Sequence, residues 1–286
     1  MEEKDWFDLT EELESDTDSE GFRRLMKEIS RRIGVDYTTY SKRHLRRRFH
    51  ARMKVVGEKT FSGYLGYVRN NEEEIEKLKD LLTVNVTKFK RNKKVWRIIQ
   101  DGVIPTVLES KREEIFKKVK CWSAGCATGE EPYSLAISYL ENGGIRGMDF
   151  KIEATDLDEG ALEFARKGEY PPKAVENLSE QEKRNYFKKM DGTWKVKDEV
   201  RELVDFRCKN IFKTDFSSRY DLILCRNLMI YFNREAKNRL TERLIESLKR
   251  NGLLILGMSE TLSMPARDLV EKYDIKSRIY RKKAED

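Results

Sequence analysis

Apolar residues near the start of the chain recur at intervals of three and four positions, which is typical of a buried helix face. The first such helix is expected to end at Gly34, and its apolar face consists of Phe22, Leu25, Met26, Ile29 and Ile33. Further helices are predicted over about 39–56, 61–68 and 75–82. Because their connections are short, we expect a small all-α N-terminal domain over residues 20–82.

After about residue 83 the pattern changes to short apolar runs that alternate with helical stretches. Strands are predicted over 119–123, 150–156, 204–208, 220–225 and 253–257, with an edge strand over 275–281. Helices are predicted up to Pro105 and over 107–116, from 130 onward, and over 158–166 and 235–248. This alternation indicates a parallel sheet with crossover helices, so we expect an α/β, Rossmann-like domain over residues 83–286.

The alternation is interrupted between about residues 170 and 205. Pro171 and Pro172 begin the interruption, Asp191–Gly192 fits a hairpin turn, and residues 194–196 have strand-forming side chains. We therefore expect a small inserted antiparallel β subdomain.

The composition fits a folded protein of one large or two modest domains. The chain has 286 residues, of which 38% are hydrophobic. No apolar run approaches the ~18 residues of a membrane span, and the acidic N-terminus lacks a signal-peptide core. We expect no membrane insertion, a cytoplasmic location, and a disordered acidic tail over residues 1–19.

Histidine and cysteine narrow the possible chemistry. The chain has only two histidines, His44 and His50, and both lie in one basic segment. This excludes a histidine-based catalytic triad and a histidine-rich metal site, and we expect no metal. The cysteines are expected to be reduced and buried, and they are Cys121, Cys126, Cys208 and Cys225.

The second predicted helix has a dense basic face. Its basic side chains include Arg43, Arg46, Arg47 and Lys54. One interpretation is a solvated cationic face, which is the usual role of a charge run. Like charges at this density repel one another on a helix, however, so we favour a surface that binds an acidic partner.

The segment from Lys120 to Ser134 has the order strand, small-residue loop, helix. Its glycines are Gly125 and Gly129, so the G-x-G-x-x-G dinucleotide fingerprint is not met. Glu131 and the acid before it open the helix, where they repel phosphate and suit a ligand that carries positive charge and hydroxyls. S-adenosylmethionine is such a ligand. The alternative is a tight structural turn with two helix-capping acids.

Other polar residues follow the predicted strands directly. In a parallel sheet the carboxyl ends of the strands meet at one edge, where ligands bind. Asp156 ends its strand about 30 residues past Gly125, where a carboxylate can accept both hydroxyls of a ribose. Its alternative role is to cap the next helix, for which Asp158 is better placed. Asn210 and the pair Arg226–Asn227 follow two further strands.

Three motifs resemble those of the CheR family of chemotaxis receptor methyltransferases. The run S-A-G-C-A-T-G-E-E-P-Y-S from Ser123 and the run C-R-N-L-M-I-Y-F from Cys225 are similar to the two family signatures. Residues 85–91, N-V-T-K-F-K-R, resemble the family's N-x-T-x-F-F-R, except that Lys90 replaces the second Phe and puts the apolar packing there in doubt. The resemblance extends from about Glu20 to the C-terminus.

The resemblance implies a class I methyltransferase that transfers a methyl group from S-adenosylmethionine to glutamate side chains of chemoreceptors, with S-adenosylhomocysteine as product. It places Arg91 and Tyr231 beside the methyl group. It implies a cofactor site formed by Asn85, Thr87, Arg91, Glu131, Asp156, Asn210, Ile211, Arg226 and Asn227. It also implies that Arg43, Arg46, Arg47 and Lys54 contact the receptor's methylation helices. We expect a monomer that does not capture a receptor tail peptide, because the hairpin turn M-D-G-T-W is short.

Two alternatives stay open. A methyltransferase of similar core could act on nucleic acid or another acidic substrate, with the basic helix gripping phosphates. Neither a D-P-P-Y-like motif nor a Pro-Cys motif follows the fourth strand, so we expect no nucleic-acid partner. A non-catalytic binding module that retains the fold is the second alternative.

Overall fold

The computed structural model describes residues 18–82, 85–144, 147–213 and 219–284. The chain divides into two compact units, Met1–Val84 and Asn85–Asp286, and each is described by itself. No helix in the described ranges is long and apolar enough to cross a membrane. The acidic tail expected over residues 1–19 lies almost entirely outside the described residues.

The first unit is all-α, as the apolar spacing predicted. Its elements are α2 (Ser19–Ile33), η3 (Tyr37–Thr39), α3 (Lys42–Val56), α4 (Phe61–Asn70) and α5 (Glu72–Leu82). Gly34 ends α2 in the left-handed region, at φ 77°, and donates its N–H to the Ser30 carbonyl. Phe22, Phe49 and Phe61 form an aromatic cluster between the helices.

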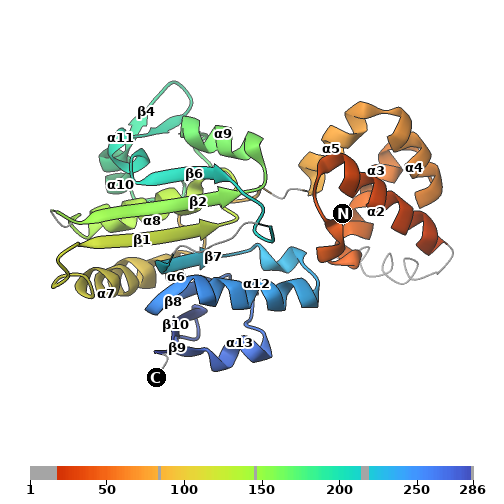
Figure 1. Ribbon diagram of the computed structural model, residues 1–286. Coiled ribbons are helices and arrows are strands. Elements are labelled where there is room, and N and C mark those ends of the chain that lie inside the picture. Colours follow the sequence, from red (N-terminus) through yellow and green to blue (C-terminus); the bar gives the residue numbers. More distant parts are fainter. Residues whose placement is uncertain (1–17, 83–84, 145–146, 214–218, 285–286) are drawn as a thin grey trace. The chain divides into compact units, whose positions relative to one another are not determined.

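The second unit is built on a seven-stranded sheet (Figure 1), in the order β6-β2-β1-β7-β8-β10-β9. The strands are β1 (Lys118–Ala124), β2 (Asp149–Asp156), β6 (Val204–Cys208), β7 (Tyr220–Cys225), β8 (Leu248–Leu256), β9 (Val270–Asp274) and β10 (Ile279–Lys282). All pairs from β6 to β8 are parallel, whereas β10 pairs antiparallel with both β8 and β9. This is the α/β architecture that the strand–helix alternation predicted.

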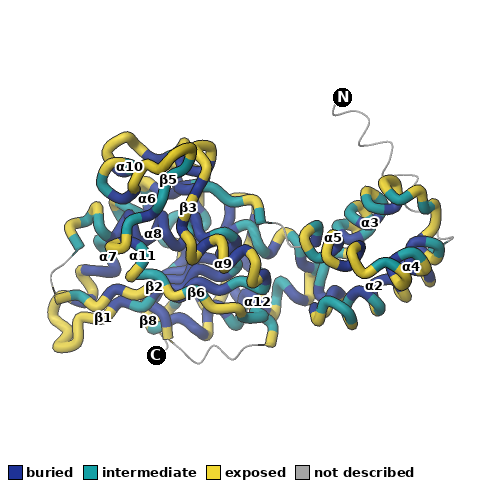
Figure 2. Tube along the Cα trace, turned by 90° about the horizontal axis from the view of Figure 1, so that it is seen from above, coloured by how far each residue is buried: buried dark blue, intermediate teal, exposed yellow. Residues whose placement is uncertain are grey.

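Helices cover the sheet and bury its central strands, which form the dark interior of this unit in Figure 2. They are α6 (Lys93–Ile98), η4 (Ile99–Val103), α7 (Ile104–Glu109), α8 (Glu130–Glu141), α9 (Glu159–Lys167), α12 (Arg234–Ser247) and α13 (Met264–Asp268). The main core joins α6, η4, α7 and α8 to alternate residues of β1, β2, β7 and β8. Alternate residues of a strand share one face, so this core lies on one side of the sheet.

The inserted subdomain is a three-stranded antiparallel sheet in the order β3-β5-β4. Its elements are β3 (Glu169–Tyr170), α10 (Glu180–Tyr186), β4 (Phe187–Lys189) and β5 (Trp194–Val196), followed by α11 (Asp198–Arg201). Gly192 turns the hairpin with φ 74°, and Met190 donates its N–H to the Thr193 carbonyl at 2.9 Å. Both the insertion and its hairpin turn were predicted from the sequence.

Three sequence predictions were wrong. The helix does not stop at Pro105, because wider π-type turns over Ile99–Val103 precede it and Pro105 occupies the first turn of α7. No helix covers 110–116, where the helical run has already ended at Glu109. The segment 275–281 is not one edge strand: it holds a turn and then β10, which lies inside the sheet, while β9 forms the edge.

The cysteines agree with the prediction in part. Cys121, Cys126 and Cys225 are buried and all four are free, but Cys208 is exposed. Cys208 ends β6, an edge strand in which no residue is buried.

Candidate active site

The loop after β1 is shaped by two glycines in the left-handed region. Gly125 has φ 76° and Gly129 has φ 93°. A Cβ atom at Gly125 would lie 2.9 Å from a methyl group of Leu228, in the loop that follows β7. The loop is anchored because Gly125 and Cys126 both donate N–H to the Thr155 carbonyl, at 2.8 and 3.1 Å. Backbone therefore takes the place of side chains here, which leaves room for a ligand at the start of α8.

Asp156 lies at the carboxyl end of β2, directly beside this loop. Its Oδ2 accepts the N–H of Ala127 at 2.8 Å, and its Oδ1 accepts the N–H groups of Leu157 and Asp158 at 2.7 and 3.1 Å. Burial raises the pKa of Asp156, and these three hydrogen bonds oppose the rise. Asp158 caps α9 by accepting the Ala161 N–H, as predicted, so Asp156 is not needed for that role.

Glu131, in the first turn of α8, is paired across the sheet edge with Arg226. Arg226 Nη1 lies 3.3 Å from Glu131 Oε2, and the Ser123 hydroxyl donates to Glu131 Oε1 at 2.9 Å. Burial raises the pKa of Glu131, and the Arg226 charge and the Ser123 hydrogen bond lower it. The Arg226 side chain is only 2% exposed, and its Nε has no hydrogen-bond partner in the described part of the chain.

Residues 85–92 lie along the same edge of the sheet. Asn85 donates to Asp158 Oδ2 at 2.7 Å, and the Arg91 carbonyl accepts from Arg226 Nη2 at 2.9 Å. The half-buried Thr87 lies between these two anchors in the sequence. Arg91 itself is half-buried and donates to the Val86 carbonyl at 3.0 Å.

Lys90, at the position of the family's second Phe, is held by polar contacts. Its backbone N–H donates to the Ser134 hydroxyl at 2.9 Å. Its buried ammonium group pairs with Glu182 of the inserted subdomain and donates to Gln100 at 2.6 Å. A buried ion pair thus joins this segment to the inserted subdomain, beside the edge-on packing of Phe89 against Tyr170 and Phe187.

The loops after β6 and β7 complete the edge. Asn210 and Ile211 are half-buried, and Asn210 Oδ1 accepts the Phe212 N–H at 2.9 Å. Asn227 adopts φ 62°, and Tyr231 is half-buried in the short helix η5 (Met229–Tyr231). Phe232 is buried and packs edge-on against Phe212, so this aromatic residue is structural.

One residue of this edge was missed by sequence reasoning. Glu260, which is 4% exposed, accepts the backbone N–H groups of Asn227, Gly257 and Met229. The sequence did contain an indication of Glu260, because this acid lies among small residues directly after β8, the strand that pairs with β7.

Of the predicted cofactor residues, Asp156 ends β2, whereas Asn210, Ile211, Arg226 and Asn227 follow β6 and β7. Glu131 lies in the first turn of α8, and Asn85, Thr87 and Arg91 lie in the segment before α6. Register places Ala124 of β1 beside Thr155 of β2, and Asp156 of β2 beside Cys208 of β6. The predicted receptor-binding residues Arg43, Arg46, Arg47 and Lys54 belong to α3 in the all-α unit and are not part of this edge.

The side chains at this edge fit S-adenosylmethionine. Carboxylates at Glu131 and Asp156 suit its ammonium group and ribose hydroxyls, and the glycine loop leaves space against the backbone. The unpartnered Nε–H of Arg226 is a buried donor for an anionic group such as the carboxylate of the methionyl part. The cofactor supplies a methyl group on a positively charged sulfur.

Comparisons with known proteins match a cofactor-binding domain to the second unit. The family model "CheR methyltransferase, SAM binding domain" matches residues 85–279, and "CheR methyltransferase, all-alpha domain" matches residues 20–83. The chain is 36% identical to a chemotaxis protein methyltransferase of Listeria innocua over 83% of this chain and 88% of that protein. It is 32% identical to that of Borreliella burgdorferi over 84% and 87%, and 30% identical to that of Escherichia coli over 85% and 84%. The chain belongs to the CheR methyltransferase family.

Proposed function

We propose that this S-adenosylmethionine-dependent methyltransferase esterifies glutamate side chains on the methylation helices of chemoreceptors. The observation that carries the proposal is the convergence of three segments, 85–91, 123–134 and 225–232, at one sheet edge. These are the segments whose motifs resemble the receptor methyltransferases. Arg226 joins all three, because it contacts Glu131 and the carbonyl of Arg91.

A glutamate nucleophile suits a site without histidine. A carboxyl group with a pKa of about 4.3 is ionised at neutral pH, so no general base has to remove a proton. Both histidines of the chain lie in α3 of the all-α unit. The remaining task is to hold the carboxylate in line with the methyl group and to exclude water. We assign Arg91 to orient the carboxylate by ion pairing and Tyr231 to direct it by a hydrogen bond.

The outer face of α3 supports an acidic protein as substrate. The basic side chains of α3 divide into two groups. Three are used within the unit: Arg46 packs over Phe22 at 4.5 Å, Arg48 donates to the Leu81 carbonyl, and Arg52 pairs with Glu74 at 2.6 Å.

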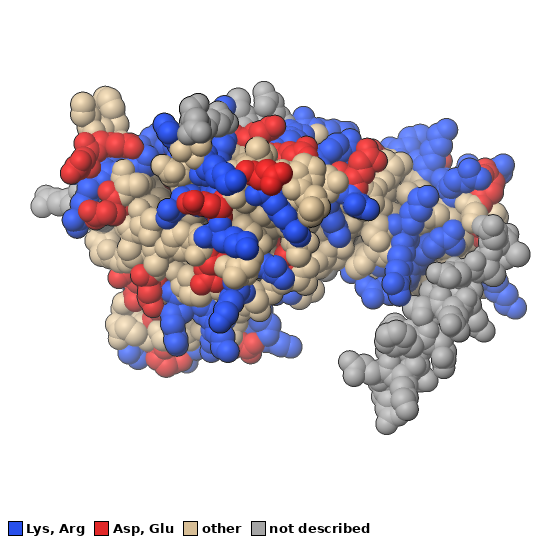
Figure 3. All heavy atoms as spheres, turned by 90° about the horizontal axis from the view of Figure 1, so that it is seen from below, with Lys and Arg blue, Asp and Glu red and all other residues tan. Residues whose placement is uncertain are grey.

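The exposed cations of α3 are Lys42, Arg43, Arg47 and Lys54, and the last three are among the predicted receptor-binding residues. None of these three has an ion pair within the described ranges, and blue side chains dominate the visible face of this unit in Figure 3. We propose that they meet the carboxylates of a receptor helix, with Arg46 contributing from the side of the helix.

The test is methyl transfer with radiolabelled S-adenosylmethionine to a purified receptor cytoplasmic helix bundle. The expected product carries label that is released as methanol by mild base, as a glutamate methyl ester requires. Replacing the acceptor glutamates by alanine should abolish labelling, and Tyr231→Phe should lower kcat. Base-stable label, or label that goes to DNA instead of the bundle, would overturn the proposal.

A further inference from the structure

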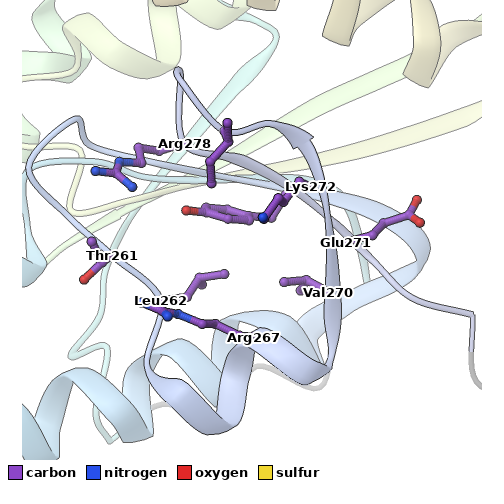
Figure 4. A pocket seen from close by; sticks show the side chains of 9 residues that line it. Thr261, Leu262, Arg267, Val270, Glu271, Lys272 and Arg278 are labelled. Carbon is purple, nitrogen blue, oxygen red and sulfur yellow. The ribbon is translucent and has the colours of Figure 1, made fainter.

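A cavity of about 340 Å³ lies beside β9, and none of the residues assigned to the cofactor lines it. Its floor is apolar and formed by Leu262, Val270 and Tyr280. Arg267, Lys272 and Arg278 surround it (Figure 4). We call these six residues and β9 the C-terminal groove. An apolar floor with cationic walls fits an occupant that has an apolar side chain and negative charge.

The cationic side chains of the groove form few polar contacts within the described part of the chain. Arg267 and Lys272 have no carboxylate within 4.0 Å in the described ranges, and Arg278 donates weakly to the Met258 carbonyl at 3.4 Å. The acid at the rim, Glu271, is paired with Arg281 at 3.5 Å and points away from the cavity in Figure 4. The groove therefore presents uncompensated positive charge.

The groove also has an open strand edge. β9 is the last strand of the sheet and pairs only with β10 among the described strands. The outer N–H and C=O groups of an edge strand are a template for an added strand. Val270 and Lys272 share one face of β9, by the alternation of strand residues, and both line the cavity.

Exposed apolar side chains lie in the segments that form the groove, at the two ends of α13 and directly after β9. Met264 is 69% exposed, and Leu269 and Ile275 are each 45% exposed. Clustered exposed apolar residues beside a cavity are typical of a protein-binding surface.

We propose that the C-terminal groove binds an extended, acidic peptide segment of a partner protein. The segment adds a strand to β9, inserts one apolar side chain into the cavity and places acids against Arg267, Lys272 and Arg278. Backbone pairing supplies affinity, while the cavity and the cations supply specificity. A small anion alone would leave the open strand and the exposed apolar residues without a role.

The test selects linear nine-residue peptides from a synthetic library on the immobilised full chain. Peptides that also bind the Arg267→Glu/Lys272→Glu variant are removed, so that only ligands of the groove remain. Both side chains are exposed, so the variant is expected to fold. We expect enrichment of a central apolar residue flanked by Asp and Glu. No enrichment, or enrichment of basic flanks, overturns the proposal.

The affinity of the best peptide for the variants then tests the role of the cations, and a proline-containing peptide tests the strand pairing. The variant should weaken binding at least tenfold, whereas the matched control Lys173→Glu/Lys188→Glu should leave it unchanged, because those exposed lysines lie in the inserted subdomain. A proline in the pairing stretch should abolish binding, because it removes a strand hydrogen bond. S-adenosylmethionine affinity should stay the same. If inorganic phosphate or AMP displaces the peptide completely, the groove is a small-anion site and the proposal is wrong.

Discussion

The carboxylate of Glu260 holds the backbone of Asn227 in a left-handed conformation. Glu260 Oε2 accepts the N–H of Asn227 at 2.9 Å, and Asn227 has φ 62°. The same carboxylate accepts the N–H of Gly257 at 2.6 Å and that of Met229 at 2.7 Å. One buried acid therefore links the end of β8 to the loop that carries Arg226, Asn227 and Tyr231.

We predict that Glu260→Gln weakens S-adenosylmethionine binding by about tenfold or more. The glutamine amide turns a donor toward backbone N–H groups, and one unsatisfied buried N–H costs about 1–3 kcal/mol. Calorimetry of cofactor binding, well below the melting temperature, measures the effect. The control is Glu271→Gln, an exposed acid of β9. Equal affinity of the Glu260 variant and wild type would show that this carboxylate does not position the loop.

A second prediction concerns the proposed ribose ligand. Asp156→Ala should weaken S-adenosylmethionine and S-adenosylhomocysteine at least tenfold, about 1.4 kcal/mol, because it removes a charged acceptor and frees the Ala127 N–H. Asp205→Ala, an exposed acid on the adjacent strand β6, is the matched control. Calorimetric titration of both variants gives the comparison, and unchanged affinity for the Asp156 variant would remove this residue from the site.

The sequence revealed those parts of the site that have a local pattern. Gly125, Asp156 and Arg226 each follow an apolar strand directly, so the rule that parallel strands end at one edge was enough to group them. The order of the strands, and with it the position of β9 at the edge, depends on pairings between distant segments and has no local pattern. Glu260 escaped prediction for a related reason, since two of its three backbone partners, Asn227 and Met229, lie 33 and 31 residues away in the chain.

Lys90 is a second case in which a contact between distant residues could not be predicted from the sequence. Its departure from the family motif was visible, but its partner Glu182 lies 92 residues later in the inserted subdomain. The sequence put the apolar packing at this position in doubt, and the structure has a buried ion pair there.

Glu130 leads to a prediction about pH. Burial raises the pKa of Glu130 to about 7, although the Thr128 hydroxyl donates to it at 2.7 Å. The folded state then binds more protons than the unfolded state between the unfolded pKa near 4.5 and pH 7, so stability falls as pH rises through this window. Glu130→Gln should remove this fall, which amounts to at most about 3 kcal/mol. Urea unfolding of the second unit at pH 5 and pH 8 measures the free energy of unfolding of wild type and variant. An equal loss of this free energy in both proteins between pH 5 and pH 8 would contradict the prediction.

The last prediction concerns the exposed cations of α3. Arg43 and Arg47 lie on a rigid helix, and the cofactor residues lie in the other unit. Exposed charge pairs are worth roughly 0.2–1 kcal/mol each, and they act mainly on encounter and register. Reversing both, as Arg43→Glu with Arg47→Glu, should therefore raise the receptor KM by roughly two- to thirtyfold and leave cofactor affinity alone. The control reverses the charge of two exposed lysines of the same unit, Lys27→Glu with Lys59→Glu, and should change the receptor KM little.

The wild-type rate at low receptor concentration should also fall with added salt, because the Debye length is only about 8 Å at physiological ionic strength. Normal methylation by the Arg43/Arg47 variant at limiting receptor would mean that this face is only solvated. Loss of S-adenosylmethionine binding in that variant would instead show that the all-α unit takes part in holding the cofactor.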